Sequence, residues 1–136
     1  MKLVLFYAHN FYFRTSSKTL DEAPDRNMEE SVDNCTVVFF HVEKEDEGNV
    51  SKVIQKFAKN TKWLCGKFET KNVVLHSFNH LSSSKATPEI AKCILDNVTE
   101  RLVRTGYKVT VTPFGYFNEF KIHVGGDSLA KVFKEF

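Results

Sequence analysis

Two short segments of this 136-residue chain combine aromatic residues, small residues and a few polar groups. The first is residues 77–83, Ser-Phe-Asn-His-Leu-Ser-Ser, and the second is residues 113–122, Pro-Phe-Gly-Tyr-Phe-Asn-Glu-Phe-Lys-Ile. Both lie where an expected strand meets a turn. Ligand pockets are typically apolar with sparse polar anchors, so the two segments predict a narrow pocket. An ordinary aromatic core strand would explain the second segment equally well.

Familiar catalytic and metal-binding motifs do not occur in the chain. His80 precedes a run of serines, but no Gly-x-Ser-x-Gly turn is present to expose a nucleophile. We interpret the serine run as a loop that leads into a helix. Cys35, His41 and Cys65 are too far apart in sequence for the paired spacing of structural zinc sites. We therefore expect neither a bound metal nor a cofactor.

A stripe of lysines marks the first expected helix. Lys52, Lys56 and Lys59 fall on one side of it, away from its apolar face. Such a stripe binds RNA phosphates in some proteins. A solvated helix face, which is the more common case, produces the same pattern.

The composition is that of a single, well-packed domain spanning residues 1–136. Hydrophobic residues make up 42% of the chain, and the net charge of +2 is only mildly basic. No apolar run is long enough for a membrane span, and no signal-peptide layout opens the chain. The cysteines number three and are scattered, which favours reduced thiols in a cytoplasmic protein over a disulfide framework.

The hydrophobic pattern predicts an α/β fold with a mixed β-sheet and two main helices. Residues 35–42 form a nearly continuous apolar run, typical of a central strand buried on both faces. Residues 16–33 are polar and acidic, and we expect a loop there. The other expected elements are strands at residues 2–9, 11–15, 72–77, 107–112 and 117–124, helices at 49–64 and from Pro88 to Gly106, and an apolar turn at 129–133.

Taken in order, the segments resemble the editing domain at the front of archaeal-type threonyl-tRNA synthetases. The resemblance covers essentially the whole chain: residues 1–9 are similar to the first strand of that family, and residues 39–44 to its central strand. Residues 78–83 resemble the family's Phe-Ala-His-Leu-Ser-Ser, and residues 113–117 and 120–122 resemble its last signature. The resemblance implies a D-aminoacyl-tRNA deacylase-like fold, which is typically dimeric.

The implied activity is proofreading. A synthetic site for threonine cannot strongly exclude serine, because one missing methyl group provides only about 10–200-fold discrimination. A second pocket would hydrolyse serine from the mischarged tRNA for threonine, acting as a module of a longer synthetase and without a cofactor. Backbone groups would bind the serine, and water would attack the ester with help from the terminal 2′-hydroxyl. By resemblance, these groups belong to Val42, Ser77, Phe78, Asn79, Phe114, Gly115, Tyr116 and Phe117.

The side chains with an implied catalytic role are His80, Asn118 and Lys131. His80 matches a family histidine, whereas the family often has lysine where this chain has Asn118, and glutamate where it has Lys131. We hypothesise that Lys131 supplies the missing ammonium from the other side of the pocket. Two alternatives stay open: a free-standing deacylase of D-aminoacyl-tRNAs, and a tRNA-binding module without catalytic activity.

Overall fold

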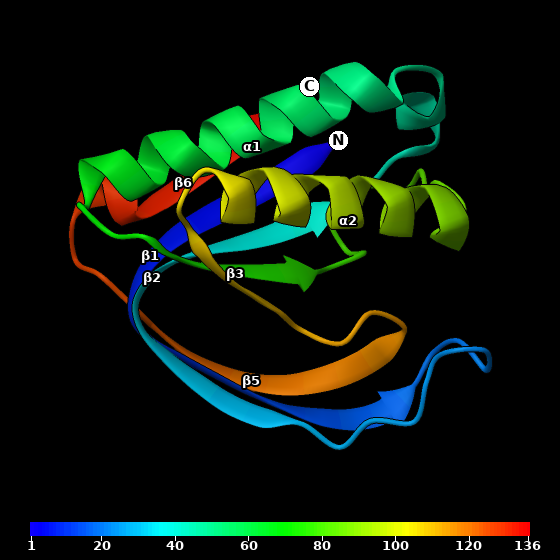
Figure 1. Ribbon diagram of the computed structural model, residues 1–136, viewed down its shortest axis with the longest axis horizontal. Coiled ribbons are helices and arrows are strands. Elements are labelled where there is room, and N and C mark those ends of the chain that lie inside the picture. The colour runs from blue at the N-terminus through cyan, green and yellow to red at the C-terminus, as the bar shows by residue number, and fades with distance from the viewer.

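The computed structural model describes all residues from 1 to 136 and consists of a curled β-sheet with two helices on one face (Figure 1). The predicted α/β class with a mixed sheet and two main helices is confirmed. The strands are β1 (Lys2–Lys18), β2 (Glu29–His41), β3 (Asn72–Ser77), β4 (Lys108–Val111), β5 (Tyr116–Val124) and β6 (Lys131–Glu135). The helices are α1 (Val50–Lys67) and α2 (Pro88–Arg104), with short 3₁₀ turns at Lys44–Gly48 and Ser128–Ala130.

The sheet has six strands in the order β4-β3-β2-β1-β5, and β6 also pairs with β1. β2, β3 and β4 are parallel, whereas β1 is antiparallel to β2, β5 and β6. β6 occupies the outer edge of the first half of β1, and β5 occupies the second half. This division lets the sheet curl, so that β5 lies well below the helices in Figure 1.

The central strand β2 is buried on both faces from Cys35 to His41, as predicted. Val38 and Phe40 belong to the core beneath the two helices. Val37 and Phe39 belong to a second cluster, inside the curl of the sheet, which contains no helical residue. Because successive side chains of a strand point to opposite faces of the sheet, β2 contributes residues to both clusters.

The expected loop at residues 16–33 is partly wrong, since β1 continues to Lys18 and β2 begins at Glu29. The polar residues of this hairpin bond across the strands: Asn10 Nδ2 donates to Ser31 Oγ at 2.7 Å and to Asp33 at 2.9 Å. The polar composition predicted a loop, but strands of a hairpin can also be polar where one face of the sheet is exposed to solvent. The predicted break between strands at 2–9 and 11–15 is also wrong. β1 is continuous there, and only its register against β5 shifts, between Ala8 and Asn10.

Both predicted helices are confirmed, with small changes at their ends. α1 runs to Lys67, about one turn beyond the predicted end. α2 begins at Pro88, and the Thr87 side chain accepts a hydrogen bond from the Ile90 amide at 3.3 Å. This is the expected N-cap followed by proline. Neither helix is long and apolar enough to cross a membrane.

The C-terminal segment differs from the prediction. Residues 129–133 were expected to form an apolar turn, but β6 begins at Lys131 and pairs with β1 through Phe6↔Lys131 and Val4↔Phe133. Alternation places Val132 against the core beneath the helices and leaves Phe133 54% exposed on the other face. A strand this short is difficult to tell from a turn by its sequence pattern.

Candidate functional site

A cleft of about 530 Å³ lies where β3 and β4 end and β5 begins. Its walls are the loop from β3 to α2, the first turn of α2, the turn from β4 to β5, and Thr19 and Leu20 after β1. The predicted pocket segments thus come together at one end of the parallel strands. Ten of the site residues expected from the sequence line the cleft: Val42, Ser77, Phe78, Asn79, His80, Phe114, Gly115, Tyr116, Phe117 and Asn118.

The turn at residues 113–116 is fixed by its glycine and its tyrosine. Gly115 has φ of +83°, and a Cβ at this position would come within 3.0 Å of the Ala23 Cβ. The Gly115 carbonyl accepts a hydrogen bond from the Thr19 amide at 2.7 Å. The Tyr116 hydroxyl donates to the Pro24 carbonyl at 2.9 Å. The connection between β1 and β2 therefore holds this wall of the cleft in place.

The opposite wall is the loop from Phe78 to Thr87, which the end of β2 holds. The His41 ring is fully buried, and its Nδ1 accepts a hydrogen bond from the Leu81 amide at 3.1 Å. Its Nε2 lies 2.6 Å from the Ser84 carbonyl oxygen. The Ala86 amide donates to the Val42 carbonyl at 3.1 Å. The end of β2 thus fixes the loop at Leu81, Ser84 and Ala86.

Glu43 is the second anchor of this loop. One of its carboxylate oxygens accepts a hydrogen bond from Ser82 Oγ at 2.7 Å, and the other accepts from the Met1 ammonium at 2.7 Å and from Lys2 at 3.0 Å. Burial alone would raise the pKa of Glu43, but these hydrogen bonds outweigh it and lower the pKa to about 2. The anchor is therefore ionised at any pH near neutral.

His76 at the end of β3 also lines the cleft, although no sequence motif points to it. Burial lowers the pKa of His76 to about 4, so the ring is neutral near pH 7. Its Nδ1 lies 3.0 Å from Thr112 Oγ1, and that hydroxyl donates to the Leu75 carbonyl at 3.4 Å. This contact fixes the orientation of the His76 ring in the wall of the cleft.

The cleft is lined by unpaired backbone N–H groups and by almost no charged side chains. The N–H groups of Asn79, Phe114 and Gly115 have no acceptor within the protein. No carboxylate lines the cleft, and Lys85 is its one lysine or arginine side chain. Backbone donors in a sheltered, weakly charged site can stabilise an oxyanion without a catalytic triad. No group of three or more His, Cys, Asp or Glu side chains is placed to hold a metal ion.

Four expected site residues lie outside the cleft. Lys131 is the first residue of β6, and its Nζ donates to the Gly125 carbonyl at 2.9 Å. The expectation that its ammonium reaches the pocket is wrong, because β6 pairs with the first half of β1, away from the turn at residues 113–116. Lys52, Lys56 and Lys59 are exposed on α1, which contributes no residue to the cleft.

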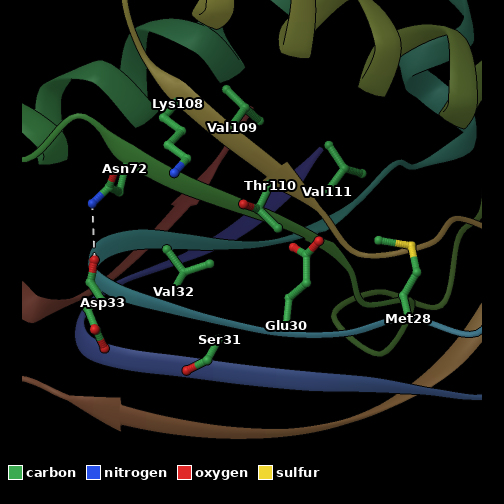
Figure 2. A pocket seen from close by; sticks show the side chains of 10 residues that line it. All are labelled: Met28, Glu30, Ser31, Val32, Asp33, Asn72, Lys108, Val109, Thr110 and Val111. Carbon is green, nitrogen blue, oxygen red and sulfur yellow. Dashed lines mark hydrogen bonds between the residues drawn. The ribbon is translucent and has the colours of Figure 1, made fainter.

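A second groove of about 630 Å³ lies between the first half of β2 and β4, and Figure 2 shows the side chains that line it. Its side chains are of mixed polarity, with Glu30 and Asp33 on β2 and Lys108 on β4. The Asn72 side chain bridges to the Asp33 carbonyl at 3.1 Å. No residue of the two pocket motifs lines this groove, so the smaller cleft is the better candidate for a reactive site despite its size.

The molecule is therefore a compact α/β domain, in which a curled mixed sheet has two helices on one face and a cleft at the ends of its parallel strands. The model of the archaea-specific editing domain of threonyl-tRNA synthetase matches residues 1–136. The chain belongs to this family. The resemblance found in the sequence and the assignment as an aminoacyl-tRNA editing domain are thereby confirmed.

Individual relatives agree with this assignment. The chain is 32% identical over its full length to the threonine–tRNA ligase of Hyperthermus butylicus, covering 23% of that protein. It is 33% identical to the threonine–tRNA ligase of Pyrococcus horikoshii over 97% of its length, covering 22% of that protein. The chain thus spans less than a quarter of the length of these relatives.

One solved structure shares the fold at low sequence identity. It carries the name c-Myc DNA Unwinding Element Binding Protein and superimposes with a TM-score of 0.66 over 99% of this chain and 98% of that one. At 14% identity this likeness concerns the fold alone.

Proposed function

We propose that this domain hydrolyses the ester of serine mischarged onto the tRNA for threonine. The observation that carries the proposal is the lining of the cleft: residues of both signature segments whose N–H groups have no acceptor in the protein line a space of about 530 Å³ that contains no carboxylate. The family assignment names the editing context. A water molecule would attack the ester carbonyl, and the terminal 2′-hydroxyl of the RNA would take part. The reaction would use no cofactor.

The N–H groups of Asn79, Phe114 and Gly115 are the proposed donors to the developing oxyanion. They belong to loops held in place before any substrate binds, and preorganised donors contribute most in a site that excludes water. His80, on the edge of the same wall, would order the attacking water or the RNA end. Its ring packs edge-on against Phe78 at a centroid distance of 4.9 Å.

Rejection of the correct substrate would be steric. Threonine differs from serine by a methyl group, and a rigid pocket disfavours the extra group. The walls here are rigid because the aromatic rings of Phe39, Phe78, His76 and Phe120 pack against one another next to the cleft. We expect threonyl esters to enter poorly or to lie out of line with the donors.

The partners of the proposed reaction are the tRNA for threonine and the remainder of a longer synthetase, within which the domain would act in cis. The relatives that are several times longer support this context. The exposed lysines of α1 are a proposed contact for RNA phosphates outside the cleft. Substituting Lys52, Lys56 and Lys59 together by glutamine should then reduce the salt dependence of RNA binding and leave single-turnover rates at saturation unchanged.

We also propose that two copies of the domain pair through the sheet face that no helix covers. Val4 and Phe6 are half-buried on this face, and Phe133 beside Val4 is 54% exposed. Contiguous exposed apolar surface of this kind marks an interaction site. Phe133→Lys should convert a dimer to a monomer in analytical ultracentrifugation, and a wild-type domain that is monomeric at 100 μM would refute the pairing.

Single-turnover deacylation by the 136-residue chain tests the main proposal. The substrates are L-seryl-tRNA and L-threonyl-tRNA for threonine, with a D-aminoacyl-tRNA alongside. Rapid loss of serine with threonine spared is the expected result. Hydrolysis of the D-ester alone would point to a deacylase of D-aminoacyl-tRNAs instead. RNA binding without turnover of any ester would leave only a tRNA-binding module.

A further inference from the structure

One polar atom in the wall of the cleft lacks a partner. Asn118 Oδ1 is buried and accepts no hydrogen bond from the protein. The Nδ2 atom of the same side chain donates to the Tyr116 carbonyl at 3.3 Å. Because a carbonyl can only accept, the amide cannot be turned around, and the oxygen is the atom left free. Among the side chains that line the cleft, this is the one buried acceptor that the fold leaves unsatisfied.

The other side-chain oxygens that line the cleft near Asn118 are already engaged. The Thr112 hydroxyl bonds with His76 and with the Leu75 carbonyl. The Tyr116 hydroxyl donates to the Pro24 carbonyl and accepts from the Arg26 amide at 2.8 Å. Buried polar groups in folded proteins are nearly always paired, and an exception calls for a ligand or a functional reason.

The proposed substrate brings the matching donor. An aminoacyl ester carries a protonated α-amino group with three N–H bonds, and that cation must be accommodated wherever the ester carbonyl binds. The cleft contains no carboxylate to receive it, and its one lysine would repel it. A neutral amide oxygen can accept a hydrogen bond from an ammonium group, and charge-assisted hydrogen bonds are the stronger kind.

We propose that Asn118 Oδ1 accepts a hydrogen bond from the α-ammonium group of the aminoacyl ester, so that Asn118 selects substrates with a free amino group. This inference rests on the proposed esterase function and assigns one of its specificity contacts. Asn118 binds the substrate in this scheme and takes no proton during hydrolysis. The residue therefore acts on binding and orientation, and an acyl group without the amine loses its contribution.

Binding of non-hydrolysable analogues tests the assignment without relying on turnover. The probes are 3′-amino-3′-deoxyadenosine acylated through an amide with serine, with 3-hydroxypropionate, which lacks the amine, or with alanine, which lacks the hydroxyl. Isothermal titration of the 136-residue chain should show the seryl analogue binding at least about tenfold more tightly than the 3-hydroxypropionyl one. Asn118→Leu, which keeps the volume without the acceptor, should reduce that ratio to below about threefold.

Asn118→Asp is the matched variant, since it keeps the shape and adds a negative charge. It should increase the preference for the amine, whereas Asn118→Lys should remove it by repulsion. Thermal unfolding checks that each variant folds. If Asn118→Leu does not fold, the comparison of Asn118→Asp with the wild type tests the assignment instead. An unchanged seryl to hydroxypropionyl ratio in Asn118→Leu would overturn the inference. Loss of the seryl to alanyl ratio instead would assign the oxygen to the serine hydroxyl and equally overturn it. If the wild type binds none of the analogues, the esterase function itself fails, and this contact fails with it.

Discussion

The Nε2 atom of His41 lies 2.6 Å from the Ser84 carbonyl oxygen, and its Nδ1 accepts a hydrogen bond from the Leu81 amide. Because the carbonyl can only accept, Nε2 carries the proton and Nδ1 does not. One neutral imidazole, fully buried, thus bridges two points of the loop that forms a wall of the cleft. His41 does not line the cleft itself. It is a positioning residue, because its two ring nitrogens hold Leu81 and Ser84 in the loop that also carries Asn79 and His80.

Removal of this bridge should impair hydrolysis without touching the substrate site. His41→Phe keeps the ring volume but leaves the Leu81 amide and the Ser84 carbonyl unpaired, at a cost of about 1–3 kcal/mol for each buried group. We expect the single-turnover rate with seryl-tRNA to fall at least about tenfold. Hydrogen exchange at the Leu81 amide should accelerate in the same variant, and this measurement does not depend on activity.

Two conservative variants separate the roles of the two nitrogens. Asn in place of His41 can retain an acceptor near the Nδ1 position, and Gln can retain a donor near the Nε2 position. His41→Asn should therefore preserve slow exchange at Leu81, whereas His41→Gln should not. Equal exchange rates in all three variants and the wild type would show that the loop is held by other contacts, such as that between Ser82 and Glu43.

Gly115 should tolerate no side chain. Its φ of +83° disfavours any L-residue by roughly 1–2 kcal/mol, and a Cβ would meet Ala23 at 3.0 Å. Gly115→Ala should lower the free energy of unfolding and reduce the rate of ester hydrolysis, because the turn carries two of the proposed donors. Ala23→Gly in the same chain should relieve only the steric part. Full recovery by the double variant, measured in urea titrations, would show that φ contributes nothing.

The elements that position the cleft could largely be predicted from the sequence. β2 and β3 are continuous apolar runs, both helices have apolar residues at helical spacing, and Thr87 caps the second helix. The pocket motifs could be found as well. The supporting contacts could not, because His41, Glu43 and Lys85 reach the loop or the cleft only through tertiary folding. The hypothesis for Lys131 is wrong because residues 129–133 read as a turn, whereas Lys131 begins β6 and pairs with the first half of β1.

Lys85 is the cation of the cleft and should contact the RNA. It lies on the exposed rim of the wall before α2, where a phosphate of the terminal nucleotides would pass. Lys85→Met keeps the alkyl chain and should weaken tRNA binding a few-fold, with a smaller slope of log K against log salt. Lys92→Met is the control, because Lys92 pairs with Asp96 on the surface of α2 and lines no part of the cleft. An equal salt slope in both variants would argue against a phosphate contact at Lys85.

Acid should destabilise the domain in two separate stages. The pKa of His76 is lowered by burial from 6.5 to about 4, so the unfolded chain binds a proton that the folded chain refuses between these values. Stability is then highest above pH 6.5 and falls as the pH decreases to about 4, by up to roughly 3 kcal/mol at 1.36 kcal/mol per pKa unit. The pKa of Glu43 is lowered from 4.5 to about 2, so its contribution is complete above pH 4.5 and is lost as the pH falls toward 2.

The two stages can be separated by variants that remove one titration each. His76→Phe preserves the aromatic packing against Phe39 and Phe120 and should flatten the free energy of unfolding between pH 6.5 and 4, as followed by urea titration at several pH values. Glu43→Gln should be less stable than the wild type at pH 7, because the Met1 ammonium loses a charged partner, yet should lose less between pH 4.5 and 2. If His76→Phe showed the wild-type slope above pH 4.5, the first stage would belong to another group, since Glu43 does not titrate there in either the folded or the unfolded chain.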